Sequence, residues 1–258
     1  MSQEPDNGYF VRIDETLVGR KPGGSAAEKA RELRAADPLG TRVARLLRLK
    51  TDERAWRKGA NGERVVGWWF GRLPEGWYVF NDIPIGRRGA NIDHLVVGPA
   101  GVFTINAKNL TGKVWVGPRT LLHNGYRTDY LPKAAAEARR ASRMLSAALG
   151  RSAEVRGVLA ILADDWTIKE QPADVHVGSP RGVKDWLLKQ PAVLSTRDVI
   201  EIAGAAAKPA TWHDPKLADA QQCPCGGEIV RRIRRRDGSP FLGCSRYPNC
   251  RRTWPAEH

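Results

Sequence analysis

Three polar residues interrupt the alternating apolar stretch NIDHLVVGPAGVFTINAKN at positions 91–109, namely Asp93, Asn106 and Lys108. Both flanks of GPAG are rich in β-branched and aromatic residues, and GPAG is a turn signal, so the stretch predicts a β-hairpin. If the loop has even length, paired positions add up to 199. Asp93 then lies directly opposite Asn106, with Cβ atoms roughly 5 Å apart. Because side chains alternate along a strand, Lys108 shares a face with Asn106, and the three polar groups meet at one end of the hairpin.

These residue types suit metal-assisted hydrolysis of a phosphodiester. Divalent metal ions in such sites need hard oxygen ligands, which Asp93 and Asn106 can supply, and a nearby lysine can orient water or stabilise the developing charge. The same side chains could instead have purely structural roles. Asp93 and Lys108 can form an ordinary cross-strand ion pair, and Asn106 can satisfy backbone groups at a strand terminus.

The order of helix, strand and hairpin, with an Asp on one strand and a Lys ending the next, resembles the PD-(D/E)xK nuclease fold. More narrowly, GANGERVV, the hairpin and the following TGKV resemble the NERD (nuclease-related) domain over about residues 55 to 170. The resemblance implies that Asp93 is a metal ligand, Lys108 the catalytic lysine and Glu63 an auxiliary acid. Asn106 stands where the nuclease motif has Asp or Glu. Its amide oxygen can bind Mg²⁺ or Mn²⁺ but lacks the charge, which Glu63 would have to supply.

All four cysteines lie near the C-terminus, at Cys223, Cys225, Cys244 and Cys250, with no cysteine in the preceding 222 residues. This distribution is typical of a zinc module and not of a disulfide framework, and two pairs of thiolates predict a closed structural Zn²⁺ site. The segment FLGCSRYPNC resembles the C-terminal zinc ribbon of bacterial type I topoisomerases. That family commonly has two residues between the first pair of cysteines, whereas this sequence has one, Pro224.

The charge balance indicates a polyanionic partner, since 42 Lys+Arg stand against 28 Asp+Glu, a net charge of +14. In the cysteine-containing tail, arginines are interleaved with Phe241, Tyr247 and Trp254, a combination suited to phosphate contacts and base stacking on single strands. We expect Trp254 to be the stacking residue and one of the other two aromatics to form the small core. The expected nucleic-acid contacts are Arg87, Arg88, Arg234, Arg235, Arg236, Arg246 and Trp254.

Hydrophobic periodicity predicts the remaining elements. Helices are predicted over Ser25–Ala36, Leu39–Leu47, Asp52–Leu73, Leu131–Leu149, Arg181–Lys189 and Thr196–Ala205. Further strands are predicted over Trp77–Ile83, Lys113–Val116, Glu154–Leu162 and Val175–Val177. Apolar residues near a 3.6 period, Trp56 and Val65 among them, are expected to form the buried face of the helix that begins at Asp52. Gly59 and Gly62 leave open whether that helix is continuous before Ala60.

The predicted fold class is α/β, a restriction-endonuclease-like mixed sheet flanked by helices, plus a small C-terminal zinc ribbon. The predicted organisation is a basic helical N-terminal extension (1–50), a NERD/PD-(D/E)xK-like domain (51–206), a linker (207–221) and a C4 zinc ribbon (222–258).

No G-x-x-x-x-G-K-[ST] loop is present, so no ATPase is indicated. MSQEPDNGYF lacks the order of a signal peptide and no long apolar run occurs, so we expect a cytoplasmic protein without a membrane partner.

Together these features predict a metal-dependent nuclease that hydrolyses DNA, with a ribbon that binds single- or double-stranded DNA, in DNA processing or repair. The alternative is a DNA-binding scaffold that keeps the nuclease fold but is weakened or inactive because of Asn106. RNA stays open as a substrate, since basic grooves and stacking residues serve both polymers.

Overall fold

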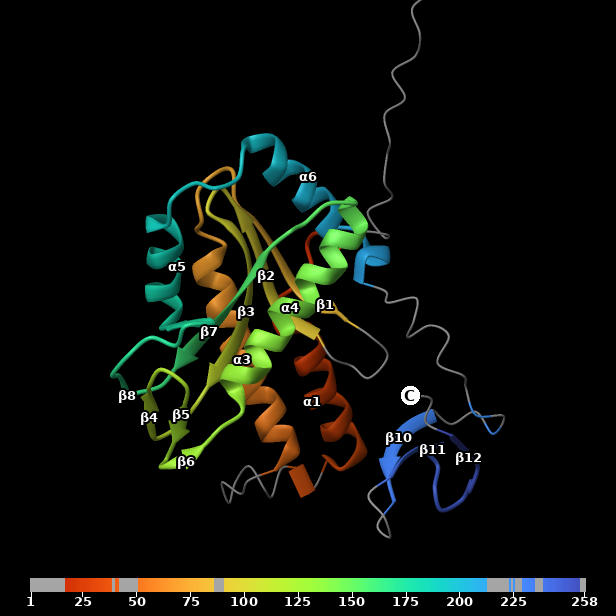
Figure 1. Ribbon diagram of the computed structural model, residues 1–258. Helices are drawn as coiled ribbons and strands as arrows, with labels where there is room; N and C mark the ends of the chain where they lie inside the picture. The colour runs from red at the N-terminus through yellow and green to blue at the C-terminus, as the bar shows by residue number, and fades with distance from the viewer. Residues whose placement is uncertain are drawn as a thin grey trace, which may run out of the picture. The chain divides into compact units, whose positions relative to one another are not determined.

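The computed structural model describes residues 17–38, 40–41, 51–85, 91–212, 223, 225, 229–234 and 239–255. The chain forms two compact units, Met1–Trp212 and His213–His258 (Figure 1). The helices of the first unit are α1 (Gly24–Ala36), α3 (Asp52–Phe70), α4 (Tyr130–Leu149), α5 (Pro180–Lys189) and α6 (Thr196–Ala206), with a final 3₁₀ turn, η2 (Pro209–Trp212). Its strands are β1 (Tyr78–Pro84), β2 (Asn91–Gly98), β3 (Gly101–Asn109), β4 (Lys113–Val116), β5 (Leu121–His123), β6 (Tyr126–Arg127), β7 (Val155–Leu162), β8 (Asp165–Ile168) and β9 (Val175–Gly178).

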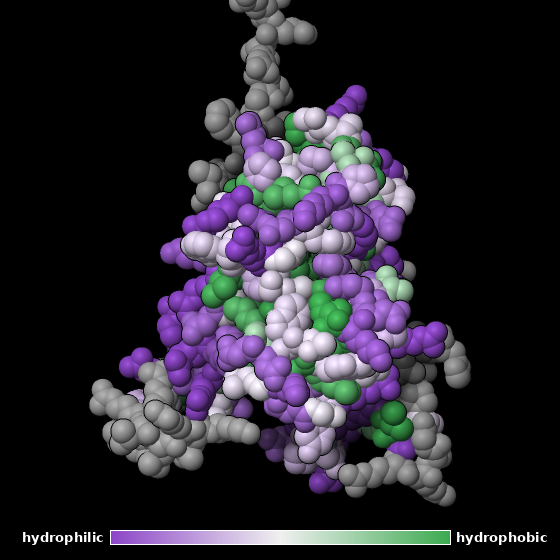
Figure 2. Space-filling model, turned by 90° about the vertical axis from the view of Figure 1, so that its left-hand side faces the viewer, coloured by the Kyte–Doolittle hydropathy of each residue, from purple (hydrophilic) through white to green (hydrophobic). Residues whose placement is uncertain are grey.

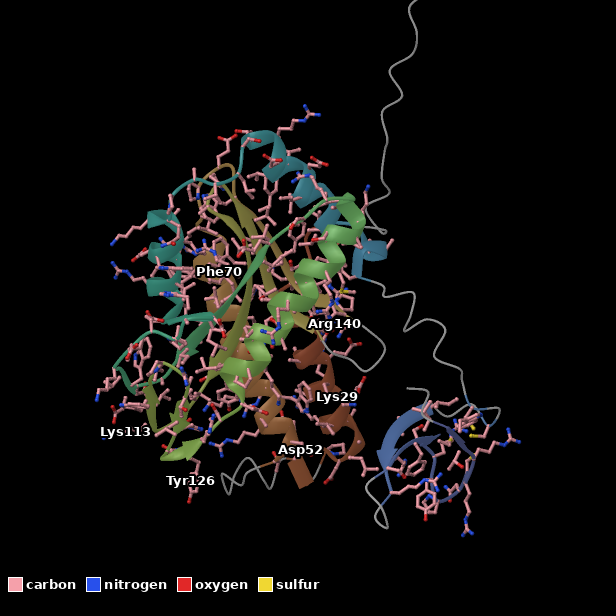
Figure 3. All side chains as sticks on the ribbon, viewed as in Figure 1. Lys29, Asp52, Phe70, Lys113, Tyr126 and Arg140 are labelled. Atoms are coloured by element: carbon pink, nitrogen blue, oxygen red, sulfur yellow. The ribbon has the colours of Figure 1, made fainter. Side chains whose placement is uncertain are left out.

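A mixed five-stranded sheet in the order β1-β2-β3-β7-β9 forms the centre of the first unit (Figure 1). The first three strands are antiparallel, and β3, β7 and β9 run parallel. On one face Val97 packs with residues of α4 and α6, and on the other Phe103 packs with residues of α3 and α5. Phe70, at the end of α3, is fully buried in the second of these clusters (Figure 3). The predicted mixed sheet flanked by helices is therefore confirmed.

The predicted hairpin is β2–β3, joined by Pro99 and Ala100. Its pairs, from Gly98 opposite Gly101 to His94 opposite Ile105, have the predicted register. The register matters because a one-residue slip would move Asn106 and Lys108 to the other face of the sheet.

Helix α3 is continuous from Asp52, through both glycines, and Thr51 caps it by accepting a 3.3 Å hydrogen bond from the Arg54 N–H. The predicted apolar face is wrong in part, since Trp56 and Val65 are 46% and 42% exposed. The helix instead packs through small residues. An added Cβ at Gly62 would lie only 2.9 Å from the Cβ of Asn109 at the end of β3. This close approach brings the helix against the strand end that follows Lys108.

Helix α1 is part of the first unit, because it packs against α3 and is bonded to β1. The Oδ2 atom of Asp82 accepts hydrogen bonds from the Ser25 N–H (3.0 Å), the Ser25 hydroxyl (2.7 Å) and Arg20 Nη2 (3.0 Å). Asp82 adopts a positive φ of 53° within β1. Most of the predicted helix Leu39–Leu47 lies outside the described residues.

At the other end of the unit, residues 207–212 were expected to begin a linker but pack with the first unit. The Trp212 side chain is 1% exposed and donates from Nε1 to the carbonyl of Ala206 at 2.9 Å.

A second, four-stranded sheet in the order β6-β5-β4-β8 lies beside the central one, and only its β4 strand was predicted. Strands β5 and β6 form a hairpin whose turn residues, Asn124 and Gly125, have φ of 52° and 83°. Positive φ at both turn residues is the requirement of a type I′ turn, for which Asn-Gly is the preferred sequence. From the side that carries α5 and this sheet, the surface is largely hydrophilic, with apolar residues in separate small patches (Figure 2).

Strand β9 forms one edge of the central sheet, and the side chain of Gln171 is hydrogen-bonded to its outer backbone groups. Gln171 donates from Nε2 to the Val177 carbonyl (2.8 Å) and accepts at Oε1 from the Val177 N–H (3.0 Å). The amide of Gln171 thus satisfies both backbone groups that point away from β7 at this position.

The second unit contains the antiparallel strands β10 (Ile229–Ile233), β11 (Pro240–Cys244) and β12 (Thr253–Pro255). Among the helices of the described residues, none combines the length and hydropathy needed to cross a membrane.

Candidate active site and zinc centre

Asp93 follows Ile92 on β2 and lies opposite Asn106 in the continued register, but the strand pairing ends at His94 and Ile105. Beyond that pair a side chain, and not the backbone of β2, bonds β3. The Asp93 Oδ2 accepts a hydrogen bond from the Ala107 N–H at 2.8 Å. Burial raises the pKa of Asp93, and the charge of Lys108 and the Ala107 N–H act in the opposite direction. Asp93 is thus fixed at the strand end with its carboxyl held against the segment that carries Lys108.

Lys108 is directed at the amide of Asn106 and not at the Asp93 carboxylate, so the structure does not contain the simple cross-strand ion pair. Its ammonium donates to Asn106 Oδ1 and, at 3.3 Å, to the Ala107 carbonyl. The ammonium also lies 5.4 Å from the centroid of the Tyr130 ring, at the start of α4. Because Lys has three N–H donors, one remains for another acceptor.

Glu63 approaches the same strand ends from α3. A backbone hydrogen bond from Gly23, just before α1, reaches its carboxyl. Burial raises the pKa of Glu63 to about 8, with further contributions from the neighbouring charges of Asp93 and Asp82. The four residues predicted for the active site, Glu63, Asp93, Asn106 and Lys108, therefore lie close enough to influence one another electrostatically.

Glu137 on α4 belongs to this cluster and was not predicted. The Nδ2 of Asn106 donates to its Oε2 at 3.4 Å, while its Oε1 is buried without a hydrogen-bond partner. Burial raises the pKa of Glu137 to about 8, with a further contribution from Asp93. A signal was present in the sequence, because Glu137 is the sole acid of α4 and lies three residues after Ala134 and four before Ala141, both buried.

The cluster suits a hard divalent cation by its chemistry. It offers three carboxyl groups and an amide oxygen, and the unpartnered Glu137 Oε1 is a buried acceptor of the kind a metal ion satisfies. The three carboxyls are less tightly gathered than a closed metal site. Within the described part of the chain, only the four cysteines place all their donor atoms within 4.8 Å of one another.

The cysteine sulfurs fit a zinc ion closely. Cys225 Sγ lies 3.3 Å from Cys223 and 3.4 Å from Cys244, and Cys223 lies 3.6 Å from Cys250. A tetrahedron with Zn–S bonds of about 2.3 Å has S···S edges of about 3.8 Å, near these values. The single residue Pro224 between the first pair does not prevent the four sulfurs from converging. The four cysteines are therefore positioned for a structural zinc site, as predicted.

The ribbon has a basic and aromatic groove, lined by Arg232, Ile233, Arg234, Phe241, Gly243, Cys244, Tyr247, Cys250, Arg251, Arg252 and Thr253. The guanidinium of Arg232 lies 5.5 Å from the Tyr247 ring, and that of Arg234 lies 5.4 Å from the Phe241 ring. Tyr247 is 60% exposed. The groove therefore brings arginines and aromatic rings together, a combination suited to phosphate contacts and base stacking.

Of the predicted nucleic-acid contacts that lie in the described residues, Arg234 lines this groove, whereas Arg246 and Trp254 do not. Arg246 instead donates to the Cys225 carbonyl at 2.6 Å, which fixes the cysteine loop. Trp254 is half-buried opposite Leu242 and does not line the groove, so Tyr247 is the more accessible aromatic. The remaining predicted contacts, Arg87, Arg88, Arg235 and Arg236, lie outside the described residues.

Comparison with known families supports both parts of the chain. Residues 58–162 match the family model of the nuclease-related domain (NERD), and residues 220–258 match that of the topoisomerase DNA-binding C4 zinc finger. Comparison with curated proteins and with solved structures gives no match. Both resemblances drawn from the sequence are confirmed: the chain carries a nuclease-related domain followed by a topoisomerase-type C4 zinc ribbon, a combination that points to DNA binding.

Proposed function

We propose that the protein is a nuclease that uses Mg²⁺ or Mn²⁺ to hydrolyse DNA phosphodiester bonds, in DNA processing or repair. The observation that carries the proposal is the gathering of Glu63, Asp93 and Glu137 around Lys108 and Asn106, with a raised pKa at each carboxyl. Several buried carboxyls with like charge are unfavourable without a counter-ion, and an added divalent cation would relieve that cost.

In this proposal Asp93, Asn106, Glu63 and Glu137 hold the ion. When bound, the ion neutralises phosphate charge and lowers the pKa of water in the site. Lys108 directs its remaining N–H toward a phosphate oxygen, where the ammonium stabilises negative charge that develops in the transition state. Asn106 keeps that ammonium in place through its Oδ1 and bonds Glu137 through its Nδ2.

A second candidate is a DNA-binding scaffold without nuclease activity, and Asn106 favours it. Its neutral amide bonds both the Lys108 ammonium and the Glu137 carboxyl and brings no charge of its own to a metal ion. With pKa values of about 8, Glu63 and Glu137 also hold protons at neutral pH when no cation is present. A protein of this kind would bind DNA equally well with and without divalent metal.

Cleavage of single- and double-stranded DNA, with RNA as a third substrate, tests the two candidates. Wild type, Lys108→Ala, Asp93→Ala and Asn106→Asp would be compared with Mg²⁺ or Mn²⁺, and DNA binding measured in parallel. The nuclease predicts cleavage by wild type and a loss of about 100-fold to 1,000-fold in Lys108→Ala, with binding retained. Undiminished cleavage in Asp93→Ala would overturn the assignment of the site.

The Asn106→Asp variant distinguishes a site with weakened nuclease activity from a site that has lost its activity. Faster cleavage than wild type would identify the amide as a weakened ligand. An inert wild type that gains cleavage on this substitution would support the scaffold candidate, as would a wild type that binds DNA but cleaves none of the three polymers.

A further inference from the structure

The β5–β6 hairpin presents an aromatic side chain that the fold does not use. Tyr126, at the tip, is 80% exposed and points outward (Figure 3). Within the described part of the chain its side chain has no hydrogen bond or ring contact, and its neighbour Arg127 forms no ion pair. Single exposed aromatics are common on protein surfaces, so Tyr126 is of interest because the next residue, Arg127, offers a free guanidinium, and a ring and an arginine together suit a base and a phosphate.

The turn of the hairpin is bonded to the segment between β3, which carries Lys108, and β4. The Asn124 side chain in the turn accepts the Lys113 N–H at 2.8 Å and donates to the Thr111 carbonyl at 3.2 Å. His123 Nε2 also bonds the Thr111 carbonyl, at 2.9 Å. Thr111 lies three residues after Lys108, so these bonds hold the turn against the segment that follows the candidate active site.

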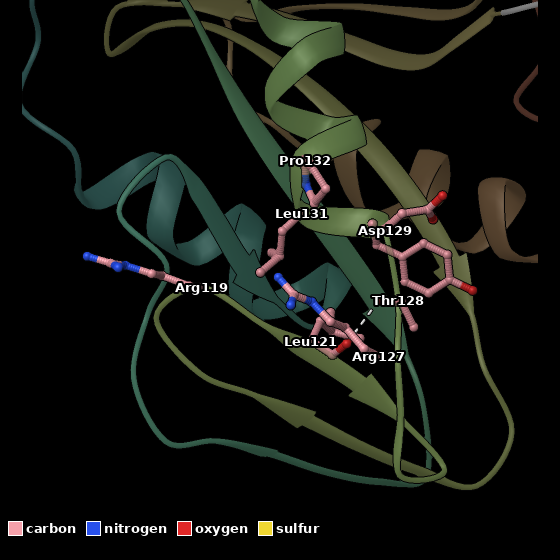
Figure 4. A pocket seen from close by; sticks show the side chains of 8 residues that line it. Arg119, Leu121, Arg127, Thr128, Asp129, Leu131 and Pro132 are labelled. Carbon is pink, nitrogen blue, oxygen red and sulfur yellow. Dashed lines mark hydrogen bonds between the residues drawn. The ribbon is translucent and has the colours of Figure 1, made fainter. Parts of the chain in front are cut away.

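A basic pocket lies beside the hairpin and shares one wall, Tyr130, with the surroundings of Lys108 (Figure 4). It is lined by Arg119, Leu121, Arg127, Thr128, Asp129, Tyr130, Leu131 and Pro132. Arg127 reaches over Leu121 toward Leu131, whereas Arg119 extends outward from the rim (Figure 4). The acid in the lining, Asp129, is paired with Lys133 at 2.7 Å, so the two arginines leave the pocket positive. The Tyr130 wall is the ring over which Lys108 lies.

We propose that the β5–β6 hairpin and its pocket hold an unpaired segment of the DNA strand next to the bond to be cleaved. Tyr126 stacks on a base of that segment, and Arg127 and Arg119 contact the adjoining phosphates. An aromatic can stack on a base only where the base is free of its partner strand, so the preferred substrate contains single-stranded DNA. This inference rests on the proposed function for the nature of the polymer.

Binding of a short single-stranded oligonucleotide containing 2-aminopurine tests the proposal, in the full chain with its zinc. Lys108→Ala serves as the background so that the probe is not cleaved. Stacking quenches 2-aminopurine, and adding Tyr126→Ala should reduce the quench to the part that the ribbon groove contributes and weaken single-strand binding by about 5-fold to 100-fold. Tyr126→Phe should retain both, whereas Tyr126→Leu, which is apolar but not aromatic, should reduce both. Tyr78→Ala, which removes a tyrosine 40% exposed on β1, is the matched control.

Arg127→Ala gives a second, independent readout. It should weaken binding and lower the slope of log affinity against log salt concentration by about one, as expected for one lost phosphate contact. Binding to a blunt duplex should change little in Tyr126→Ala, and thermal unfolding of each variant should match the background protein.

The outcomes separate this inference from the proposed nuclease. Loss of quench and affinity in Tyr126→Ala, in a protein that cleaves nothing, would sustain the stacking hairpin while the nuclease proposal fails. Cleavage by wild type together with unchanged affinity and quench in Tyr126→Ala would overturn the hairpin proposal alone. An equal loss of affinity in the Tyr78→Ala control would also overturn it.

Discussion

The two candidate metal sites of this chain are built in opposite ways. The zinc centre takes four ligands of one type from one short segment, and all four sulfurs already lie within 4.8 Å of one another. The carboxylate site takes its residues from α3, β2, β3 and α4, and its groups are held apart by hydrogen bonds to Gly23, Ala107 and Asn106. We expect the zinc centre to assemble around its ion as the ribbon folds, whereas the carboxylate site is held in place by the core of the first unit.

This difference separates what each metal does for the protein. About 36 residues bury little apolar surface, so we expect the ribbon to need zinc to fold. The first unit has a complete core on both faces of its sheet and does not need an ion to fold. A cation there would instead relieve the unfavourable burial of the charged carboxyls, and its binding would release the protons that those carboxyls hold.

Removal of one zinc ligand should have the largest effect. Cys244→Ser should abolish stoichiometric zinc binding and unfold the ribbon, because structural zinc contributes on the order of 10 kcal/mol to folding such modules. The first unit should unfold at its wild-type temperature. Zinc content and differential scanning calorimetry would check this, and a common loss of both units would contradict the separation of the two centres.

Glu137→Gln should have the next largest effect, on metal affinity. The substitution keeps the shape of the side chain and removes its charge, so Mn²⁺ affinity should fall by about 10-fold to 100-fold. In wild type, Mn²⁺ binding should strengthen as pH rises toward 8, because the protons of Glu63 and Glu137 must leave. The variant should show a shallower rise. Titration calorimetry across pH would measure both, and an unchanged affinity would exclude Glu137 from the site.

The stability of the first unit without divalent ions should fall as pH rises. Glu63 and Glu137 have pKa values of about 8 in the folded chain against an ordinary 4.5, so the folded state binds more protons between these values. Their favourable contribution is complete below about pH 4.5 and is lost as pH passes through 8. Since both side chains are partly exposed, we expect a loss on the order of 1–3 kcal/mol. Thermal unfolding from pH 5 to 8 would measure it, and Mg²⁺ should oppose the loss at the upper end.

Two glycines of α3 give the smallest and most local test. A Cβ at Gly62 would lie 2.9 Å from Asn109, so Gly62→Ala should displace the helix, move Glu63 and destabilise the unit by about 1–3 kcal/mol. A Cβ at Gly59 meets nothing within 4 Å, so Gly59→Ala should stabilise the helix by about 0.5–1 kcal/mol. Urea unfolding would compare the two, and equal effects would refute the role given to the helix contact.

Sequence reasoning succeeded where a pattern is local. The hairpin register followed from GPAG, and it gave the positions of Asp93, Asn106 and Lys108 without knowledge of the fold. The four cysteines were recognisable by type and spacing alone. In both cases the neighbours in space are set by a turn or by a shared ligand within one segment.

Residues contributed by tertiary packing were missed. Glu137 reaches the site because α4 packs across β3 and β7, and its place among the buried alanines of α4 did not show which strands that face would meet. Trp56 looked like a core residue by its period, but small residues bring α3 so close to β3 that the tryptophan is left outside. The β5–β6 hairpin was missed because two- and three-residue strands are too short to show periodicity, although Asn124-Gly125 was a usable turn signal.

The Gln171 side chain limits how copies of this protein can assemble. Edge strands invite another chain to continue the sheet, but at Val177 both backbone groups are already occupied by one amide. A partner that extended the sheet here would first have to break two hydrogen bonds and leave the Gln171 amide to find water. At Val177, therefore, another strand would pair with β9 only after displacing the Gln171 amide.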